Sequence, residues 1–379
     1  MLSLKQNEDD ARKRLRAFWA GSSLGRPVVL TGVKPSPLPP APRQPWDGRP
    51  REEVDWLPEM HAWAADHWLS QAQPEQWLGE AMPRVCFAPA CCLGLPAALV
   101  GARYRYDGNT AWIEPLPDLY NRPLPHFDPY AEPFVRLRQC VQAQIGAVKG
   151  RAFVNPPLFL DAMTTLSLLR TPERLCLDLI ERPDDVRRWR DALTRIYTDT
   201  YEWIYRMLLA AGHGEAGSFF TLMAEGRMEA VQCDFAVMLS PEQFAEFVLP
   251  DLRATTEYLD FSLYHLDGTC QMRFLDLLAG LPKLNGIQWN PEPGAGSPVD
   301  WLDALRAIRE RDLVLAVACA NVEEAETLTR ELGPDGLALF LPAFDTATAA
   351  EDALRRLDAS ARGCRLPGRT RRIQAKRTG

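Results

Sequence analysis

The segment 264–268, with the sequence Tyr-His-Leu-Asp-Gly, carries the residue types in this chain best suited to acid–base chemistry. It ends an apolar run typical of a β-strand, and strand alternation places His265 and Asp267 on one face. Histidine exchanges protons near neutral pH, and the aspartate could orient the imidazole, raise its pKa or hold a cation. We therefore predict a catalytic centre at His265 and Asp267, which are also the candidate metal ligands. The alternative is a buried histidine that is bonded to a neighbouring carboxylate.

Two further candidates, Gln288 and Trp289, end the next apolar run along the chain. Adjacent strand ends would bring them beside His265, so both are predicted to contact a substrate. The tryptophan could form a stacking wall for the substrate or belong to the core.

Other polar residues follow predicted strands and are candidate substrate contacts. Glu225 and Arg227 follow a predicted strand at 218–222 in a loop with Gly226, and could clamp a substrate or form an ion pair at the rim. Asn155 ends the third predicted strand and could contact a ligand or loop backbone.

The last two candidates are Asp234 and Cys319. Asp234 lies before a helix start and could reach the pocket or cap a turn. Cys319 follows the seventh predicted strand and is a candidate ligand or nucleophile. Asp161 and Arg170, by contrast, are predicted to form a buried structural ion pair.

The elements that must position these residues alternate between short β-rich runs and longer amphipathic helices. This alternation favours parallel strands with helices packed outside. Eight strands are predicted, and the last four units have the spacing of repeated βα elements. The strands are 28–33, 84–88, 151–155, 218–222, 262–266, 286–289, 313–318 and 337–341; the helices include 173–179, 183–209, 241–258, 274–279, 301–310 and 322–332. The sequence therefore predicts an α/β protein, a (β/α)8 TIM barrel with an irregular N-terminal extension. Residues 1–365 would form one domain, followed by a disordered basic tail at 366–379.

Composition narrows the classes of partner. The 379 residues are 46% hydrophobic and carry a net charge of -7, which gives no electrostatic case for nucleic acid or anionic membrane. No apolar run reaches the ~18 residues of a membrane span. The nine cysteines include no CxxC pair, as expected for reduced thiols in a cytoplasmic protein. The expected partner is a small-molecule substrate, and a homodimer is left open.

Several sequence blocks along the chain, taken in order, are similar to a known family. They are Ala17-Phe18-Trp19 with Gly25-Arg26-Pro27, Met82-Pro83, Thr110-Ala111-Trp112, Leu169-Arg170 with Asp178-Leu179-Ile180, Gln232-Cys233-Asp234-Phe235 with Ser240-Pro241-Glu242-Gln243-Phe244, Tyr264-His265-Leu266-Asp267-Gly268, and Ile287-Gln288-Trp289. Together they resemble the uroporphyrinogen decarboxylase-like superfamily, in the branch related to corrinoid methyltransferases and cobalamin-independent methionine synthase. The resemblance runs from about residue 10 to residue 360.

This resemblance implies methyl transfer to or from a thiol or corrinoid, with a corrinoid protein as a candidate partner. In the family, zinc is held by His-x-Cys after the fifth strand and by a cysteine after the eighth, and it lowers the pKa of the thiol. Here His265 matches the histidine, but Asp267 stands in place of the cysteine, Gln288 or Trp289 takes the sixth-strand position, and 341–345 contains no cysteine. The departure makes zinc doubtful and keeps two alternatives open: a decarboxylase or lyase acting on a small carboxylated substrate, and a ligand-binding barrel without catalysis.

A single barrel domain predicts that no part of the chain folds alone. Cutting the chain near residue 150 or residue 215 should yield no stable fragment, because a barrel closes only when its first and last strands meet. Limited proteolysis followed by size-exclusion chromatography and circular dichroism checks this. A fragment that unfolds cooperatively by itself would contradict it.

Overall fold

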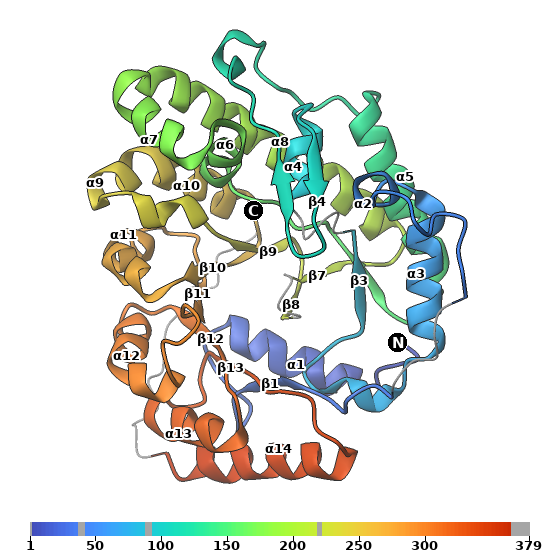
Figure 1. The fold of residues 1–379 in the computed structure, drawn as a ribbon. Coiled ribbons are helices and arrows are strands. Elements are labelled where there is room, and N and C mark those ends of the chain that lie inside the picture. Colours follow the sequence, from blue (N-terminus) through green and yellow to red (C-terminus); the bar gives the residue numbers. More distant parts are fainter. Residues whose placement is uncertain (1, 37–41, 88–92, 218–221, 365–379) are drawn as a thin grey trace.

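The structure is a ring of strands with helices packed outside it (Figure 1). It is a computed structural model that describes residues 2–36, 42–87, 93–217 and 222–364. Eight strands of the described chain follow one another around the ring. They are β1 (Val28–Thr31), β3 (Arg84–Cys86), β6 (Phe153–Asn155), β9 (Met228–Val231), β10 (Phe261–Asp267), β11 (Gly286–Asn290), β12 (Val314–Ala318) and β13 (Leu337–Phe340). The chain is a (β/α)8 barrel, as its alternating pattern predicts.

Strand pairing joins the two ends of the chain. From β9 to β13 each strand pairs in parallel with the next, and β13 pairs in parallel with β1 through the register Val28↔Ala338. A short strand, β2 (Leu78–Gly79), lies antiparallel on the other edge of β1. The strands β3 and β6 form a parallel pair.

Helices follow most of the strands and cover the outside of the ring (Figure 1). The longer ones are α1 (Glu8–Trp19), α3 (Pro58–Ser70), α5 (Glu132–Val148), α6 (Ala162–Arg170), α7 (Pro172–Glu181), α8 (Pro183–Ala210), α10 (Leu249–Tyr258), α12 (Leu302–Glu310), α13 (Val322–Leu332) and α14 (Ala347–Arg362); shorter ones are α2 (Arg51–Val54), α4 (Gly94–Leu99), α9 (Pro241–Gln243) and α11 (Leu275–Ala279). The predicted helices are confirmed. Ser240 begins its helix with a reciprocal capping box, in which its side chain and that of Gln243 each bond the other's backbone N–H.

Seven of the eight predicted strands are confirmed to within two residues at each end. The prediction at 218–222 falls largely outside the described residues, and Leu222 itself belongs to no strand. On either side of it, β7 (Glu215–Gly217) and β8 (Met223–Glu225) pair antiparallel, and β9 follows β8 in the chain. It is β9 that pairs with β10, through the register Met228↔Phe261.

Alternation along the strands creates two apolar layers. Side chains such as Leu263, Val314 and Ala338 point into the barrel, whereas Tyr264, Leu315 and Leu339 point out to the helices. The inner layer also includes residues of α1, notably Phe18 and Trp19, and the Trp19 indole N–H donates to the Met223 carbonyl at 2.9 Å. Helix α1 precedes β1 and therefore packs across the amino end of the barrel.

Two further predictions concern the C-terminal tail and the absence of membrane-spanning helices. The expected tail at 366–379 lies outside the described residues. In the described part of the chain, no helix combines the length and apolar character that a bilayer crossing requires.

Where β11 pairs with β12, the backbone of Val314 lies very close to Gly286, so a substitution at this glycine tests the pairing. A Cβ added at Gly286 would overlap the carbonyl oxygen of Val314, a backbone atom that cannot turn aside. The substitution Gly286→Ala should therefore lower the free energy of unfolding by about 2 kcal/mol or more in urea denaturation. The control is Gly146→Ala on the exposed side of α5, where nothing lies within 4 Å, and this variant should be neutral or slightly more stable. Equal effects at both positions would contradict the expectation.

Candidate functional site

A hydrogen bond between two paired strands orients His265. The register of β10 and β11 sets His265 beside Gln288, and Nδ1 of the imidazole bonds the Gln288 Oε1 atom. The other end of that amide donates from Nε2 to the Trp289 carbonyl at 3.0 Å, which identifies Oε1 as the end facing the ring. Nδ1 must then carry the proton, so Nε2 is the acceptor nitrogen of the neutral ring.

The surroundings keep this imidazole neutral. His265 is 8% exposed, and burial lowers its pKa below the ordinary value more than the Gln288 bond and the nearby Asp267 charge raise it. Its neutral form therefore predominates at pH 7. A neutral histidine with a defined tautomer can accept a proton at Nε2.

Asp267 lies one step further along the same face of β10. Its register partner is Asn290, whose Nδ2 donates to the Asp267 Oδ1 atom at 2.7 Å. The turn that follows is held by Glu292, which accepts from the Thr269 backbone N–H at 2.7 Å and from its hydroxyl at 2.8 Å. The loops after β10 and β11 thus support each other at the carboxyl end of the barrel.

Asp234 belongs to the same region. It follows β9, receives a hydrogen bond from Gln232 Nε2 at 3.3 Å, and its backbone N–H donates to the Thr164 hydroxyl at 2.9 Å. Burial, and then the Asp267 charge, raise the pKa of Asp234 to about 6. The structure therefore brings Asp234 to the predicted centre.

A fourth polar residue of this region is Asp161, which the sequence predicts to pair with Arg170. That prediction is wrong: Arg170 donates to Asp178 at 2.7 Å, and Asp161 instead caps α6 by accepting from the Thr164 N–H at 2.8 Å. Within the described residues, Oδ2 of Asp161 is buried and has no hydrogen-bond partner. Burial, with the Asp251 charge second, raises the pKa of Asp161 to about 8, so it is mostly protonated at pH 7.

Glu225 and Arg227 lie elsewhere. The sequence predicts that they follow the fourth barrel strand, but Glu225 ends the short strand β8 and Arg227 directly precedes β9, the strand that pairs with β10, so both come before that barrel strand. Glu225 accepts from Arg16 Nε of α1 at 2.9 Å, and Arg227 Nε pairs with Asp260, just before β10, at 3.1 Å. Both residues form ion pairs at the amino end of the barrel, away from His265.

Trp289 and Cys319 face the helices. Because Gln288 points into the barrel, its neighbour Trp289 points out, and the indole packs against Trp301 with ring centroids 5.8 Å apart. Cys319 is likewise packed in the outer apolar layer, and burial raises its pKa to about 12. The expected stacking wall is therefore core, and the Cys319 thiol stays protonated.

Asn155 is fully buried at the end of β6 and bridges the backbone of the next strand. With Nδ2 directed at the Glu215 carbonyl, at 3.2 Å, its Oδ1 accepts from the Gly217 N–H at 3.3 Å. Of the two alternatives for this residue, the contact with backbone is the one present.

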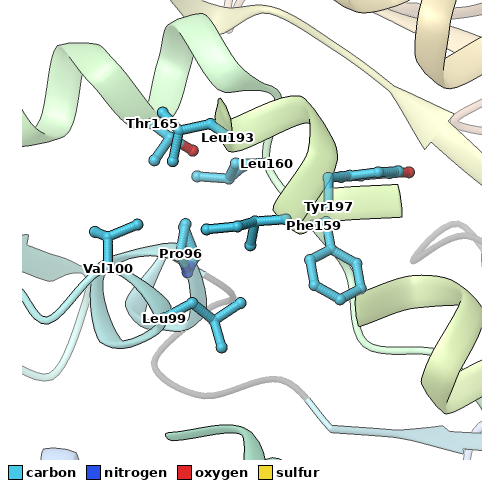
Figure 2. A pocket seen from close by; sticks show the side chains of 9 residues that line it. Pro96, Leu99, Val100, Phe159, Leu160, Thr165, Leu193 and Tyr197 are labelled. Carbon is cyan, nitrogen blue, oxygen red and sulfur yellow. The ribbon is translucent and has the colours of Figure 1, made fainter. Parts of the chain in front are cut away.

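An apolar hollow of 290 Å³, including its opening, lies outside the strands between α4, α6 and α8 (Figure 2). Its lining consists of Pro96, Leu99, Val100, Phe159, Leu160, Thr165, Leu193, Ile196 and Tyr197. Phe159 and Leu160 directly precede Asp161, so the hollow adjoins the segment that holds this carboxyl group. The hydroxyl of Tyr197 points away from the other labelled side chains (Figure 2).

The donor set does not fit the zinc site that the resemblance implies. Within the described ranges, no group of three or more His, Cys, Asp or Glu side chains is arranged to hold a metal ion. His265 and Asp267 offer nitrogen and oxygen, Asp267 already accepts from Asn290, and the Cys319 thiol faces the helices. A zinc ion held by thiolates needs softer ligands than these.

Comparison with known proteins supports the fold. The chain matches the solved structure of a methyltransferase from Methanosarcina mazei with a TM-score of 0.54 and 16% identity, covering 93% of this chain and 98% of that one. A dihydrodipicolinate synthase from Oceanobacillus iheyensis matches at a TM-score of 0.30 and 12% identity, over 60% of this chain and 55% of that one, which is too distant to support an argument. No protein-family model and no curated protein matches the sequence.

The protonated state of Asp161 predicts a dependence of stability on pH. The folded protein keeps this proton until about pH 8, whereas the unfolded chain releases it near pH 4, so raising the pH between these values favours unfolding. Asparagine is neutral and also caps helices well. Asp161→Asn should therefore be more stable than the wild type at pH 8, by about 1–3 kcal/mol, with the difference shrinking towards pH 4.

The measurement is urea denaturation at pH 5, 6, 7 and 8. Asp303→Asn is the control, because it makes the same chemical change at a fully exposed carboxylate. A difference between Asp161→Asn and the wild type that stays constant with pH would mean that Asp161 is ionised in the folded protein.

Proposed function

We propose that this chain is a TIM-barrel methyltransferase acting on a small molecule, with His265 as the residue that accepts a proton from the methyl acceptor. The observation that carries the proposal is the His265–Gln288 bond, which makes Nε2 the acceptor nitrogen of a neutral imidazole near the end of β10. The likeness of almost the whole chain to a methyltransferase supports the reaction class. A thiol as acceptor and a methylcorrinoid as donor are the reactants we favour.

The proton transfer has a defined chemical balance. A thiol R–SH gives its proton to Nε2 of His265, and the thiolate attacks the methyl group of a donor CH3–X. The S–C bond forms, the C–X bond breaks, and its electron pair leaves with X. A thiolate is a far stronger nucleophile than a thiol, so a neutral base beside the sulfur raises the rate.

The carboxyl groups of Asp161 and Asp234 would act on the leaving group X of the methyl donor. Asp161 is mostly protonated at pH 7, and Asp234, with a pKa of about 6, is partly so. Either group can give a proton to a leaving group that needs one. Because the donor set does not fit zinc, no step in this proposal passes through a protein-bound zinc ion.

The proposal predicts a measurable reaction. Methylcobalamin mixed with 2-mercaptoethanol should lose its methyl group faster when the protein is present, followed by visible absorbance and by mass spectrometry of the S-methyl product. His265→Ala should reduce this rate by about 10²–10⁴-fold while leaving the fold intact, because a general base contributes about that much. His126→Ala, at an exposed histidine, is the control and should retain the rate.

Stability of the same variant separates catalysis from a structural role. If His265 only filled the core, its removal would cost roughly 2–4 kcal/mol of stability, and the reaction of the folded fraction would continue. That result, or a wild-type rate equal to the protein-free background, would rule out the proposed function.

A further inference from the structure

Arg84 is a charged residue that points into the barrel. It begins β3, and its register partner on β6 is Phe153, whose ring belongs to the inner apolar layer. The next residue, Val85, packs against the outer layer, so alternation directs Arg84 and Cys86 inwards. Both inward side chains are only partly buried.

No carboxylate of the described residues pairs with the guanidinium of Arg84. Within the described residues its contact is a long one, from Nη1 to the Cys86 sulfur at 3.7 Å, and its Nε is buried without a partner. Two other arginines of the barrel, by contrast, each pair with a carboxylate. Arg12, above the ring of Phe153, pairs with Glu8 at 2.7 Å, and Arg26 is buried against Glu80 at 2.7 Å.

One acidic residue, Glu229, feels the charge of Arg84 but does not neutralise it. Glu229 of β9 is close enough for Arg84 to lower its pKa, yet burial raises that pKa to about 8 overall. Glu229 is therefore mostly uncharged at pH 7 and is a poor counter-ion. An arginine in a partly desolvated interior without an anion is costly, and a bound anion removes that cost.

We propose that Arg84 binds an oxyanion of the ligand, a carboxylate or a phosphate group. A planar guanidinium matches both groups with two parallel N–H donors. The strand β3 stands across the ring from β10 and β11 (Figure 1). The inference rests on the proposed function only in calling this ligand a substrate.

Isothermal titration calorimetry with succinate and with inorganic phosphate tests the proposal and separates the two anions. At least one should bind the wild type, and Arg84→Gln should weaken binding tenfold or more. Arg105→Gln, at an exposed arginine of β4 (Tyr104–Tyr106), is the control and should bind as the wild type does. Arg84→Lys keeps the charge but not the paired donors, so it should bind with intermediate affinity even if the glutamine variant folds poorly.

The outcomes are distinct from those of the methyl-transfer assay. Binding of neither anion, or equal binding by the wild type, Arg84→Gln and Arg84→Lys, overturns the inference whatever the enzyme does. Anion binding that depends on Arg84 supports it, and it does so even if no methyl transfer is found, in which case only the proposed reaction fails.

Discussion

The register between β10 and β11 is the constraint on which the site depends. One alignment of backbone places His265 beside Gln288 and Asp267 beside Asn290, so both polar pairs arise from the same set of ladder hydrogen bonds. A slip of one residue would turn both β10 side chains towards the helices. The glycine at the start of β11 belongs to this constraint, because only a residue without a Cβ allows the next strand to approach so closely.

An amide is well suited as the partner of His265. A carboxylate in its place would attract a proton to the ring and raise its pKa, whereas Gln288 fixes the tautomer without adding a charge. The same avoidance of charge is seen around it: burial favours the neutral forms of Asp161 and, to a smaller degree, Asp234. The carboxyl end of the barrel is therefore rich in acidic residues and yet carries less negative charge than its composition suggests.

Sequence reasoning succeeded where a local rule was sufficient. Strand alternation was enough to place His265 and Asp267 on one inward face. The same rule, applied to the pair Gln288 and Trp289, shows that only one of them can face inwards, and the structure selects the amide. That error could have been avoided from the pattern alone.

Other errors required information that local patterns do not contain. Glu225 and Arg227 were misplaced because β7, β8 and β9 are three short runs in succession, and no local pattern shows which of them joins β10. Arg170 has an acidic residue at similar separation on either side, and only the packing of α6 against α7 selects Asp178. The inward arginine at position 84 was overlooked because it stands among apolar residues, where a single charge is easily taken for a strand boundary.

The pairing of β1 with β13 has a consequence for biosynthesis. The first strand leaves the ribosome early, but the edge that receives β13 stays unpaired until about residue 340 has emerged. The other edge of β1 can be covered much sooner, since β2 comes only about fifty residues later in the chain. During most of translation the nascent chain therefore exposes one apolar strand edge, which is a surface that attracts other unfinished chains. Contacts this distant in sequence also form slowly, so the interval in which chaperones can bind extends beyond the release of the finished polypeptide.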